Sequence, residues 1–156
     1  MSVMDMFKNI SYLMMMVLLS GCTTVSIPNY IQDKNPYKRV YYADFEDVLK
    51  TTTKALENYG WVVTNKYDPT VFEQTKELSS PQAKQLMLTT DVRQTPLVVG
   101  TRYARINAYV RTVDEKSTEV EMRYVTVNSL PFKSFNSYRN DRAIKHLLDS
   151  IGEILK

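Results

Sequence analysis

The sequence predicts an α+β fold, a two-layer sandwich in which two amphipathic helices cover one face of a mainly antiparallel sheet of four to five strands. Two observations lead to this prediction. Two segments, one following residue 44 and one at the end of the chain, carry apolar residues at helical spacing. Residues 97–113 and 118–127 are rich in β-branched and aromatic residues and are separated by the turn-forming sequence Asp-Glu-Lys-Ser.

The composition is that of an ordinary globular domain. Among 156 residues, 44% are hydrophobic and 24% are charged, which is enough apolar material for a packed core. The net charge is +3, with Lys and Arg scattered among Asp and Glu. This balance favours neither nucleic-acid binding nor a polybasic membrane patch. The lone cysteine and lone histidine fall short of a structural metal site, so we expect no metal and no cofactor.

The first predicted elements are a short strand at residues 39–43 and a helix that follows it. Asp44 is the expected N-cap, and Gly60 ends the helix. The apolar stripe of this helix consists of Phe45, Val48, Leu49, Thr52, Ala55, Leu56 and Tyr59. Trp61 opens the next strand, which we expect to stop at Asp68-Pro69.

Residues 70–96 show no clear periodicity. We expect a loop-rich excursion with a short helical turn near Pro81, because Ser-Pro is a common helix start. A strand at residues 86–92 is the alternative.

The two long strand segments should form a hairpin in a definite register. Pairing Val110 with Val120 aligns the apolar faces of both strands, whereas a slip of one residue would expose a whole set. The apolar face then holds Ala104, Ile106, Ala108, Met122 and Tyr124. On the other face the same register sets Arg111 opposite Glu119, a favourable pair, and Tyr109 opposite Glu121. We interpret these carboxylates as part of a solvated charge ladder.

The chain should end in a helix from about residue 138 or 140 to residue 155. Its buried stripe consists of Ile144, Leu147, Leu148, Ile151, Ile154 and Leu155. Before it, residues 129–138 carry Phe132, Phe135 and Tyr138. These aromatic side chains either pin the loop onto the core or present an aromatic knob to a partner.

The N-terminal apolar run, residues 10–19, is too short to span a bilayer, which takes about 20 apolar residues. It also lacks the polar face of a core helix, so a secretory signal fits it best. The run ends in Leu19-Ser20-Gly21-Cys22, which resembles the lipobox of bacterial lipoprotein precursors. Because Asp5 is unusual in a signal peptide, we expect translation to start at Met6 or Met4.

The resemblance implies that Cys22 is acylated and that the peptide before it is removed. Acyl chains on Cys22 would anchor the protein to a membrane. Thr23 stands where Asp commonly marks inner-membrane retention, which implies the periplasmic face of the outer membrane in a cell with two membranes. We therefore expect a signal peptide at 1–21, the acylated cysteine and an extended tether at 22–38, and a single domain at 39–156.

The sheet face opposite the helices is the candidate surface for a partner. It should carry Tyr103, Arg105, Asn107, Tyr109 and Arg111. Tyr and Arg are typical of protein interfaces, although Tyr also favours strands for its own sake, and both interpretations stay open.

No residue pattern supports catalysis. His146 is expected at the edge of the C-terminal helix's buried stripe, where a solvated histidine is the simplest interpretation, so we predict that the protein is not an enzyme. The element order and the Tyr59-Gly60-Trp61 helix end resemble the helix-grip domains of lipoproteins of the barrel-assembly machinery. That resemblance implies an accessory module of an envelope complex with a protein partner. A small-ligand or lipid carrier with a groove between helices and sheet is the alternative.

Overall fold

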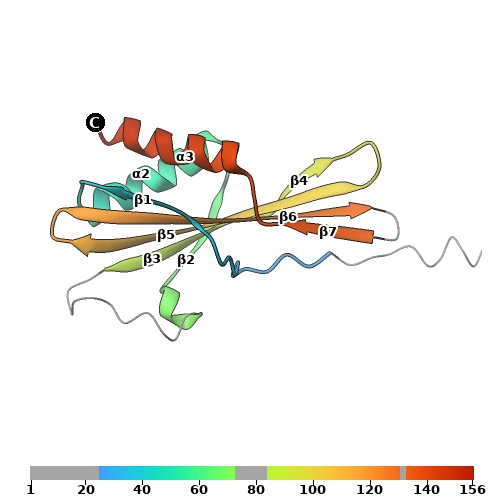
Figure 1. The fold of residues 1–156 in the computed structure, drawn as a ribbon, viewed down its shortest axis with the longest axis horizontal. Coiled ribbons are helices and arrows are strands. Elements are labelled where there is room, and N and C mark those ends of the chain that lie inside the picture. The colour runs from blue at the N-terminus through green and yellow to red at the C-terminus, as the bar shows by residue number, and fades with distance from the viewer. Residues whose placement is uncertain (1–24, 73–83, 131–132) are drawn as a thin grey trace, which may run out of the picture.

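The protein folds into two layers, with two helices on one face of a sheet (Figure 1). The computed structural model describes residues 25–72, 84–130 and 133–156. Helices α2 (Phe45–Asn58) and α3 (Asp141–Ile154) pack together and cover the same face of an antiparallel sheet. The predicted α+β class is confirmed. The predicted four to five strands is wrong, because the sheet has seven.

The seven strands result from the length of the central hairpin. The strands are β1 (Tyr37–Tyr41), β2 (Val63–Tyr67), β3 (Gln85–Thr90), β4 (Arg93–Pro96), β5 (Thr101–Asp114), β6 (Ser117–Leu130) and β7 (Lys133–Ser137). The strands β5 and β6 have 14 residues each, so each is long enough to pair with two short strands in succession. Strands β3 and β4 lie along β5, while β1 and β7 lie along β6. The sheet order along the main path is β1-β6-β5-β3-β2.

Residues 70–96 contain more regular structure than predicted. The expected loop-rich excursion is wrong for residues 85–90 and 93–96, which form β3 and β4. The alternative of a strand at residues 86–92 is close to what is found. The sequence pattern of this strand is weak because its two buried apolar residues, Met87 and Leu88, are followed by two threonines that are also buried. The predicted turn near Pro81 lies outside the described residues.

The register of the central hairpin is confirmed. Val110 pairs with Val120, and Arg111 pairs with Glu119. The turn closes through a bulge between Thr112 and Asp114, which supplies the extra residue that the register requires.

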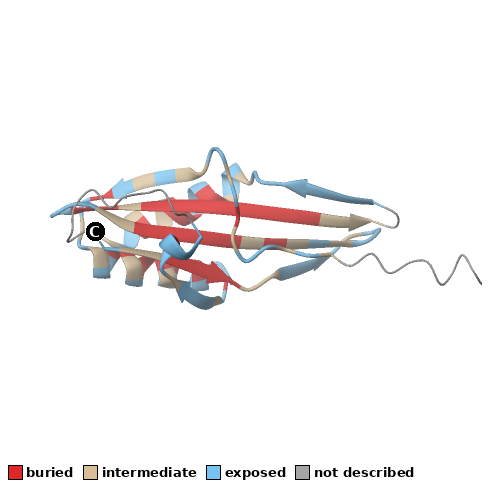
Figure 2. Ribbon diagram, turned by 90° about the horizontal axis from the view of Figure 1, so that it is seen from below, coloured by how far each residue is buried: buried red, intermediate tan, exposed pale blue. Residues whose placement is uncertain are grey.

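The core lies between the helices and the sheet. Figure 2 shows buried residues concentrated in the central parts of the long strands. Fully buried core residues from the sheet include Leu88, Ile106, Val110, Val120 and Met122. The Tyr41 hydroxyl donates to the Leu148 carbonyl oxygen at 2.6 Å, and the Tyr37 hydroxyl donates to Asp141. Both bonds fasten β1 to helix α3.

The helices follow their predicted stripes with two exceptions, and one of them is Tyr59 at the end of α2, which is 43% exposed. In α3, Ile144, Leu147, Leu148 and Ile151 are buried, but Ile154 is 38% exposed. Ile154 lies in the last turn of α3, whereas its neighbour Leu155 packs partly buried against the core. Asn140 caps α3, its Oδ1 accepting from the Ala143 N–H at 3.3 Å. Asp44 occupies the predicted N-cap position of α2 but forms no side-chain capping hydrogen bond.

Two glycines give opposite expectations for stability. Gly100 has φ +94°, and an added Cβ would lie 1.9 Å from the Ser129 carbonyl oxygen. Gly100→Ala should therefore lower the free energy of unfolding by about 2–4 kcal/mol. Gly152 lies in α3, and its added Cβ would meet Tyr41 at an ordinary 3.6 Å. Gly152→Ala should raise the free energy of unfolding by up to about 1 kcal/mol.

Urea unfolding of the purified protein and of the two variants measures both effects. A Gly100→Ala variant as stable as the unsubstituted protein would contradict the close contact between the 97–100 turn and β6.

Candidate functional site

The N-terminal segment, which we define as residues 25–36, crosses the sheet face that the helices leave open. In Figure 1 it runs along the underside of the sheet before entering β1. Ile31 is fully buried against this face. The segment has no helix or strand, as predicted, but the prediction of a free tether is wrong for residues 25–38. Tyr37 and Lys38 already belong to β1, so the fold begins before the expected residue 39.

Side chains of the sheet hold the N-terminal segment by its backbone. The Arg105 guanidinium donates to the carbonyl oxygens of Ile27 and Pro28, at 3.4 and 3.0 Å. The Asn107 amide donates to the Asn29 carbonyl oxygen at 2.8 Å. An irregular segment has no strand ladder to satisfy its carbonyl groups, so side-chain donors take over that role.

Arg123 links the segment to the sheet from the neighbouring strand. Its Nη1 donates to the Ile31 carbonyl oxygen and to the hydroxyls of Tyr30 and Tyr109, each at 3.2 Å. Its guanidinium also stacks over the Tyr109 ring, with 4.2 Å from Cζ to the ring centroid. The segment is thus bound by hydrogen bonds, a cation–π contact and the burial of Ile31.

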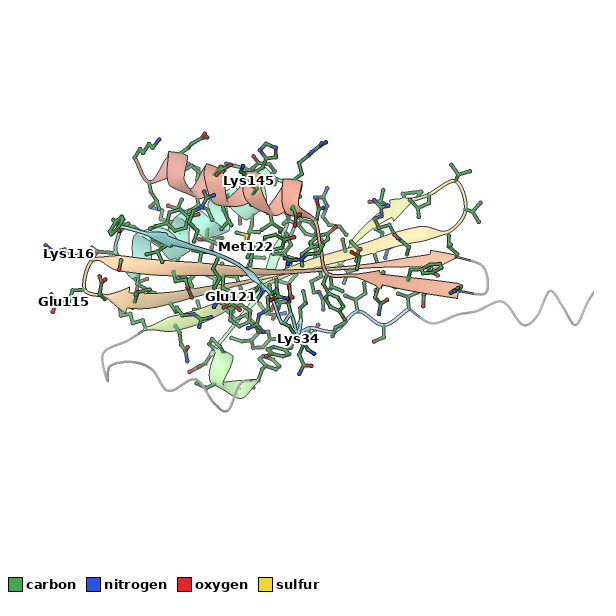
Figure 3. All side chains as sticks on the ribbon, viewed as in Figure 1. Lys34, Glu115, Lys116, Glu121, Met122 and Lys145 are labelled. Carbon is green, nitrogen blue, oxygen red and sulfur yellow. The ribbon has the colours of Figure 1, made fainter. Side chains whose placement is uncertain are left out.

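Glu121 lies at the centre of a buried ionic network on the same face. Figure 3 shows Glu121 on the underside of the sheet, while its neighbour Met122 points toward the helices. The Glu121 side chain is fully buried, with Oε1 2.7 Å from the Arg123 guanidinium and Oε2 2.8 Å from that of Arg111. Lys38 Nζ lies 3.2 Å from the same Oε2. The interpretation of a solvated charge ladder is therefore wrong for Glu121, because its carboxylate is fully buried and paired with Lys38, Arg111 and Arg123.

The network keeps Glu121 ionised. Burial by itself raises the pKa of this carboxyl. The hydrogen bond and charge of Arg123 and the charge of Arg111 outweigh burial and hold the pKa below the ordinary 4.5. The carboxylate is therefore the charged counterpart of three cations from β1, β5 and β6.

The five residues of the predicted partner surface do share the sheet face, but the face is not open. Asn107 is fully buried and Tyr109 is 1% exposed, so an approaching partner cannot reach them. Tyr103, Arg105 and Arg111 are half-buried. The prediction of a surface free for a partner is wrong at Asn107 and Tyr109. Side chains of this face, among them Arg105 and Asn107, instead bind the N-terminal segment of the same chain.

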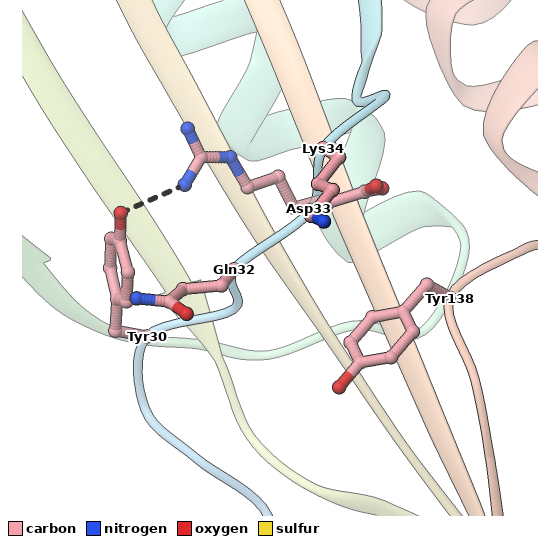
Figure 4. A pocket seen from close by; sticks show the side chains of 6 residues that line it. Tyr30, Gln32, Asp33, Lys34 and Tyr138 are labelled. Atoms are coloured by element: carbon pink, nitrogen blue, oxygen red, sulfur yellow. Dashed lines mark hydrogen bonds between the residues drawn. The ribbon is translucent and has the colours of Figure 1, made fainter.

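A hollow of about 660 Å³ lies between this segment and the sheet (Figure 4). It is lined by Tyr30, Gln32, Asp33, Lys34, Arg123 and Tyr138. Figure 4 shows the hydrogen bond from Arg123 to the Tyr30 hydroxyl at its wall. Arg123 at the wall of this hollow is already bound to Glu121 and to the N-terminal segment. We therefore interpret the hollow as a surface recess beside a structural network.

The space between the helices and the sheet is occupied by packed core side chains, where the alternative function placed a ligand groove. His146 is exposed on α3, as expected. Within residues 25–72, 84–130 and 133–156, no three His, Cys, Asp or Glu side chains form a group that could hold a metal ion. No helix in the described part of the chain is long and apolar enough to cross a bilayer.

The aromatic side chains before α3 do not all pin a loop onto the core, which is one of the two interpretations of this stretch. Phe135 is 47% exposed and Tyr138 is 41% exposed, so neither pins a loop onto the core. Residues 133–137 form β7 at the edge of the sheet. Phe132 and the lipobox residues Leu19, Ser20, Gly21 and Cys22 lie outside the described residues.

Sequence reasoning missed Arg123 and Ile31, which are central to this face. Arg123 stands within an otherwise apolar and aromatic run, between Met122 and Tyr124. A charged residue in the middle of such a strand could have indicated a buried partner on the face opposite the helices. For Ile31 there was no such signal, because its neighbours are polar and without periodicity.

Comparison with known proteins adds no relative to this picture. A scan against models of protein families finds none that matches the chain, and a search of curated proteins finds no match to its sequence.

Removing the charge of Glu121 should destabilise the fold strongly. Glu121→Gln leaves Arg123 buried without its counter-charge, and breaking such a pair costs about 3–5 kcal/mol in the free energy of unfolding. Because the pKa of Glu121 is lowered in the fold, its stabilisation is present above pH 4.5 and is lost as the pH falls below that value. The gap between the unsubstituted protein and the variant should therefore shrink in acid.

Glu119→Gln is the matched control. Glu119 is partly exposed and has one charged partner, Arg111 at 3.3 Å, so its loss should cost about 1 kcal/mol or less. Urea unfolding at pH 7 and at acidic pH measures both variants. Equal losses for the two variants at pH 7 would contradict the central role of Glu121.

Proposed function

We propose that this protein is a lipid-anchored protein of the bacterial cell envelope, whose domain is a non-catalytic interaction module held at the membrane surface. One observation carries the proposal: the lipobox-like sequence Leu19-Ser20-Gly21-Cys22 directly follows a short apolar run. Acylation of Cys22 would supply two or three chains, which is what stable anchoring requires. With Thr23 after the cysteine, the proposed location in a cell with two membranes is the periplasmic face of the outer membrane.

The docked N-terminal segment supports a position close to the membrane. Cys22 precedes Val25 by three residues, and three residues span at most about 10 Å. From residue 27 onward the chain is hydrogen-bonded to the sheet. A free tether over residues 22–38 would give a reach of several tens of ångströms, whereas this arrangement leaves only a few residues between anchor and domain.

The outer edge of β1 is the surface that best supports an interaction role. β1 is the terminal strand on the main path of the sheet, so one side of its backbone is without a neighbouring strand among the described residues. Val40 is 45% exposed and Tyr42, just beyond the strand, is 93% exposed. An edge strand with exposed apolar side chains is suited to pair with an extended segment of another protein.

Acylation is tested at Cys22. Cys22→Ser should abolish both the acyl mass and the signal cleavage, because the thiol is the acylated group. Intact-mass analysis and fractionation of envelopes measure these changes. Thr23→Asp is the control, since it keeps the cysteine and should remain acylated while moving to the inner membrane of a two-membrane cell. An unchanged mass and unchanged cleavage in Cys22→Ser would overturn the proposed anchor.

The interaction role is tested at Tyr42. A photo-crosslinking amino acid at this position should give a discrete covalent adduct with an envelope protein in intact cells. Tyr59, which is 43% exposed at the end of α2, is the matched control and should give no such adduct. Adducts of the same size at both positions, or at neither, would contradict a partner at the β1 edge.

A further inference from the structure

The end of the sheet that contains β4 and β7 projects beyond the two helices. We call it the distal end, and define it as β4, the turn at residues 97–100, residues 101–105 of β5, residues 126–130 of β6, and β7. Figure 1 shows that neither helix covers it, and Figure 2 shows it mostly exposed or half-buried. Within the described residues, the N-terminal segment reaches this end only as far as Arg105, and the turn beyond it is exposed.

Two adjacent valines occupy the tip of the distal end. Val98 is fully exposed at 105%, and Val99 is 56% exposed. The turn that carries them is closed, because the Leu97 N–H donates to the Gly100 carbonyl oxygen at 3.1 Å. Gly100 in turn packs closely against the backbone of Ser129 on β6. The valines are therefore held outward by a closed turn, where their side chains are available for contact with another apolar phase.

The charges at the distal end have one sign. Residues 92–113 and 122–140 contain no Asp or Glu. Arg93, Arg102 and Lys133 are exposed there. Arg102 is held by a hydrogen bond to Asn128 at 3.0 Å, and Lys133 Nζ lies 4.8 Å from the centre of the half-exposed Phe135 ring. Cations around aliphatic and aromatic side chains are typical of surfaces that bind the interface of an anionic bilayer.

The N-terminal segment leads from the fold toward this same end. Going back along the chain, Ile31 contacts Arg123, Asn29 contacts Asn107, and Ile27 contacts Arg105. Arg123 and Asn107 are cross-strand partners, so these contacts advance by about two residues along β5 toward its start at Thr101. The blue part of the ribbon in Figure 1 follows this path.

The lengths of chain allow the anchor and the tip to reach one plane. Cys22 precedes Ile27 by five residues, a reach of at most about 16 Å. From Arg105 to Thr101 the strand extends by four residues, about 13 Å, and the turn with Val98 lies just beyond. A bilayer that receives the acyl chains of Cys22 therefore lies within reach of the tip.

We propose that the distal end docks on the surface of an anionic lipid bilayer, with Val98 and Val99 inserted among the headgroups and Arg102 and Lys133 against lipid phosphates. This inference rests on the proposed acylation of Cys22. It orients the domain with the distal end toward the membrane and the β5–β6 turn, with Glu115 and Lys116 at its tip, away from it (Figure 3). The anchor favours a bilayer over a protein partner as the occupant, since it brings lipid to this end in every molecule.

Tryptophan fluorescence in vesicles tests the docking. Val98→Trp places a reporter at the tip, and Val113→Trp places the matched reporter near the opposite turn, where Val113 is 50% exposed. The native Trp61 is buried and gives a background common to both variants. The full acylated protein is reconstituted into vesicles of phosphatidylcholine and phosphatidylglycerol whose acyl chains carry bromine, which quenches tryptophan on contact.

Val98→Trp should be quenched at least about twofold more than Val113→Trp, and more strongly with phosphatidylglycerol present than with phosphatidylcholine alone. Equal quenching of the two variants, in protein that floats with the vesicles, would overturn the docking and leave the anchor intact. Protein that does not float with the vesicles would overturn the anchor and the docking with it. Quenching independent of phosphatidylglycerol would overturn the role assigned to Arg102 and Lys133. A Val98→Trp emission that is shielded from water but not quenched by the brominated chains would also overturn the docking and would instead indicate a second protein copy at the tip.

Discussion

A carboxylate buried on the face of a sheet is costly unless cations meet it, and three cations meet Glu121. Among the described residues, Arg123 and Arg111 contact its two oxygens, and Lys38 of β1 lies beside one of them. Arg123 uses its remaining donor capacity on the segment that precedes β1. Through this arrangement one ionised group joins three strands and, by way of Arg123, the irregular N-terminal segment. Arg105 and Asn107 of β5 hold the same segment.

The two faces of the sheet are therefore stabilised by different chemistry. The face under the helices is packed with aliphatic side chains such as Ile106 and Met122. The opposite face relies on Arg and Asn side chains that donate hydrogen bonds to backbone carbonyl groups, and on tyrosine hydroxyls that accept from Arg123. Helices can cover a sheet by apolar burial alone because their own backbone is satisfied, whereas an irregular segment brings unpaired carbonyl groups that require donors. The polar composition of this face follows from what covers it.

Tying the N-terminal segment to the sheet also decides how the domain can be presented at a membrane. A flexible tether would let the domain take any orientation, but a segment bound along β5 leads out of the fold toward one end. At that end the exposed charges are positive and the tip is aliphatic, while the acidic residues of β6 lie toward the other end. Mean composition conceals this separation, because charges that are mixed along the chain become segregated once the strands are aligned.

The elements with strong periodicity could be predicted from the sequence, down to the pairing of Val110 with Val120 and the buried stripe of α3 as far as Ile151. Local patterns suffice there, since a helix or hairpin that buries one face has a single register that does so. The strand count was underestimated because short strands such as β4 and β7 carry no apolar pattern of their own and exist only where the long hairpin offers backbone to pair with.

Sequence patterns alone were sufficient for the α+β class, the two amphipathic helices, the central hairpin and the lipobox-like motif at Cys22. Long-range contacts make residues 25–36 part of the domain, bury Glu121, and cover Asn107 and Tyr109. These features depend on contacts such as the one between Ile31 and Arg123, which are more than ninety residues apart. No periodic pattern in the sequence indicates such a contact. A local pattern reports which face of an element is apolar, and long-range packing alone decides what lies against a polar face.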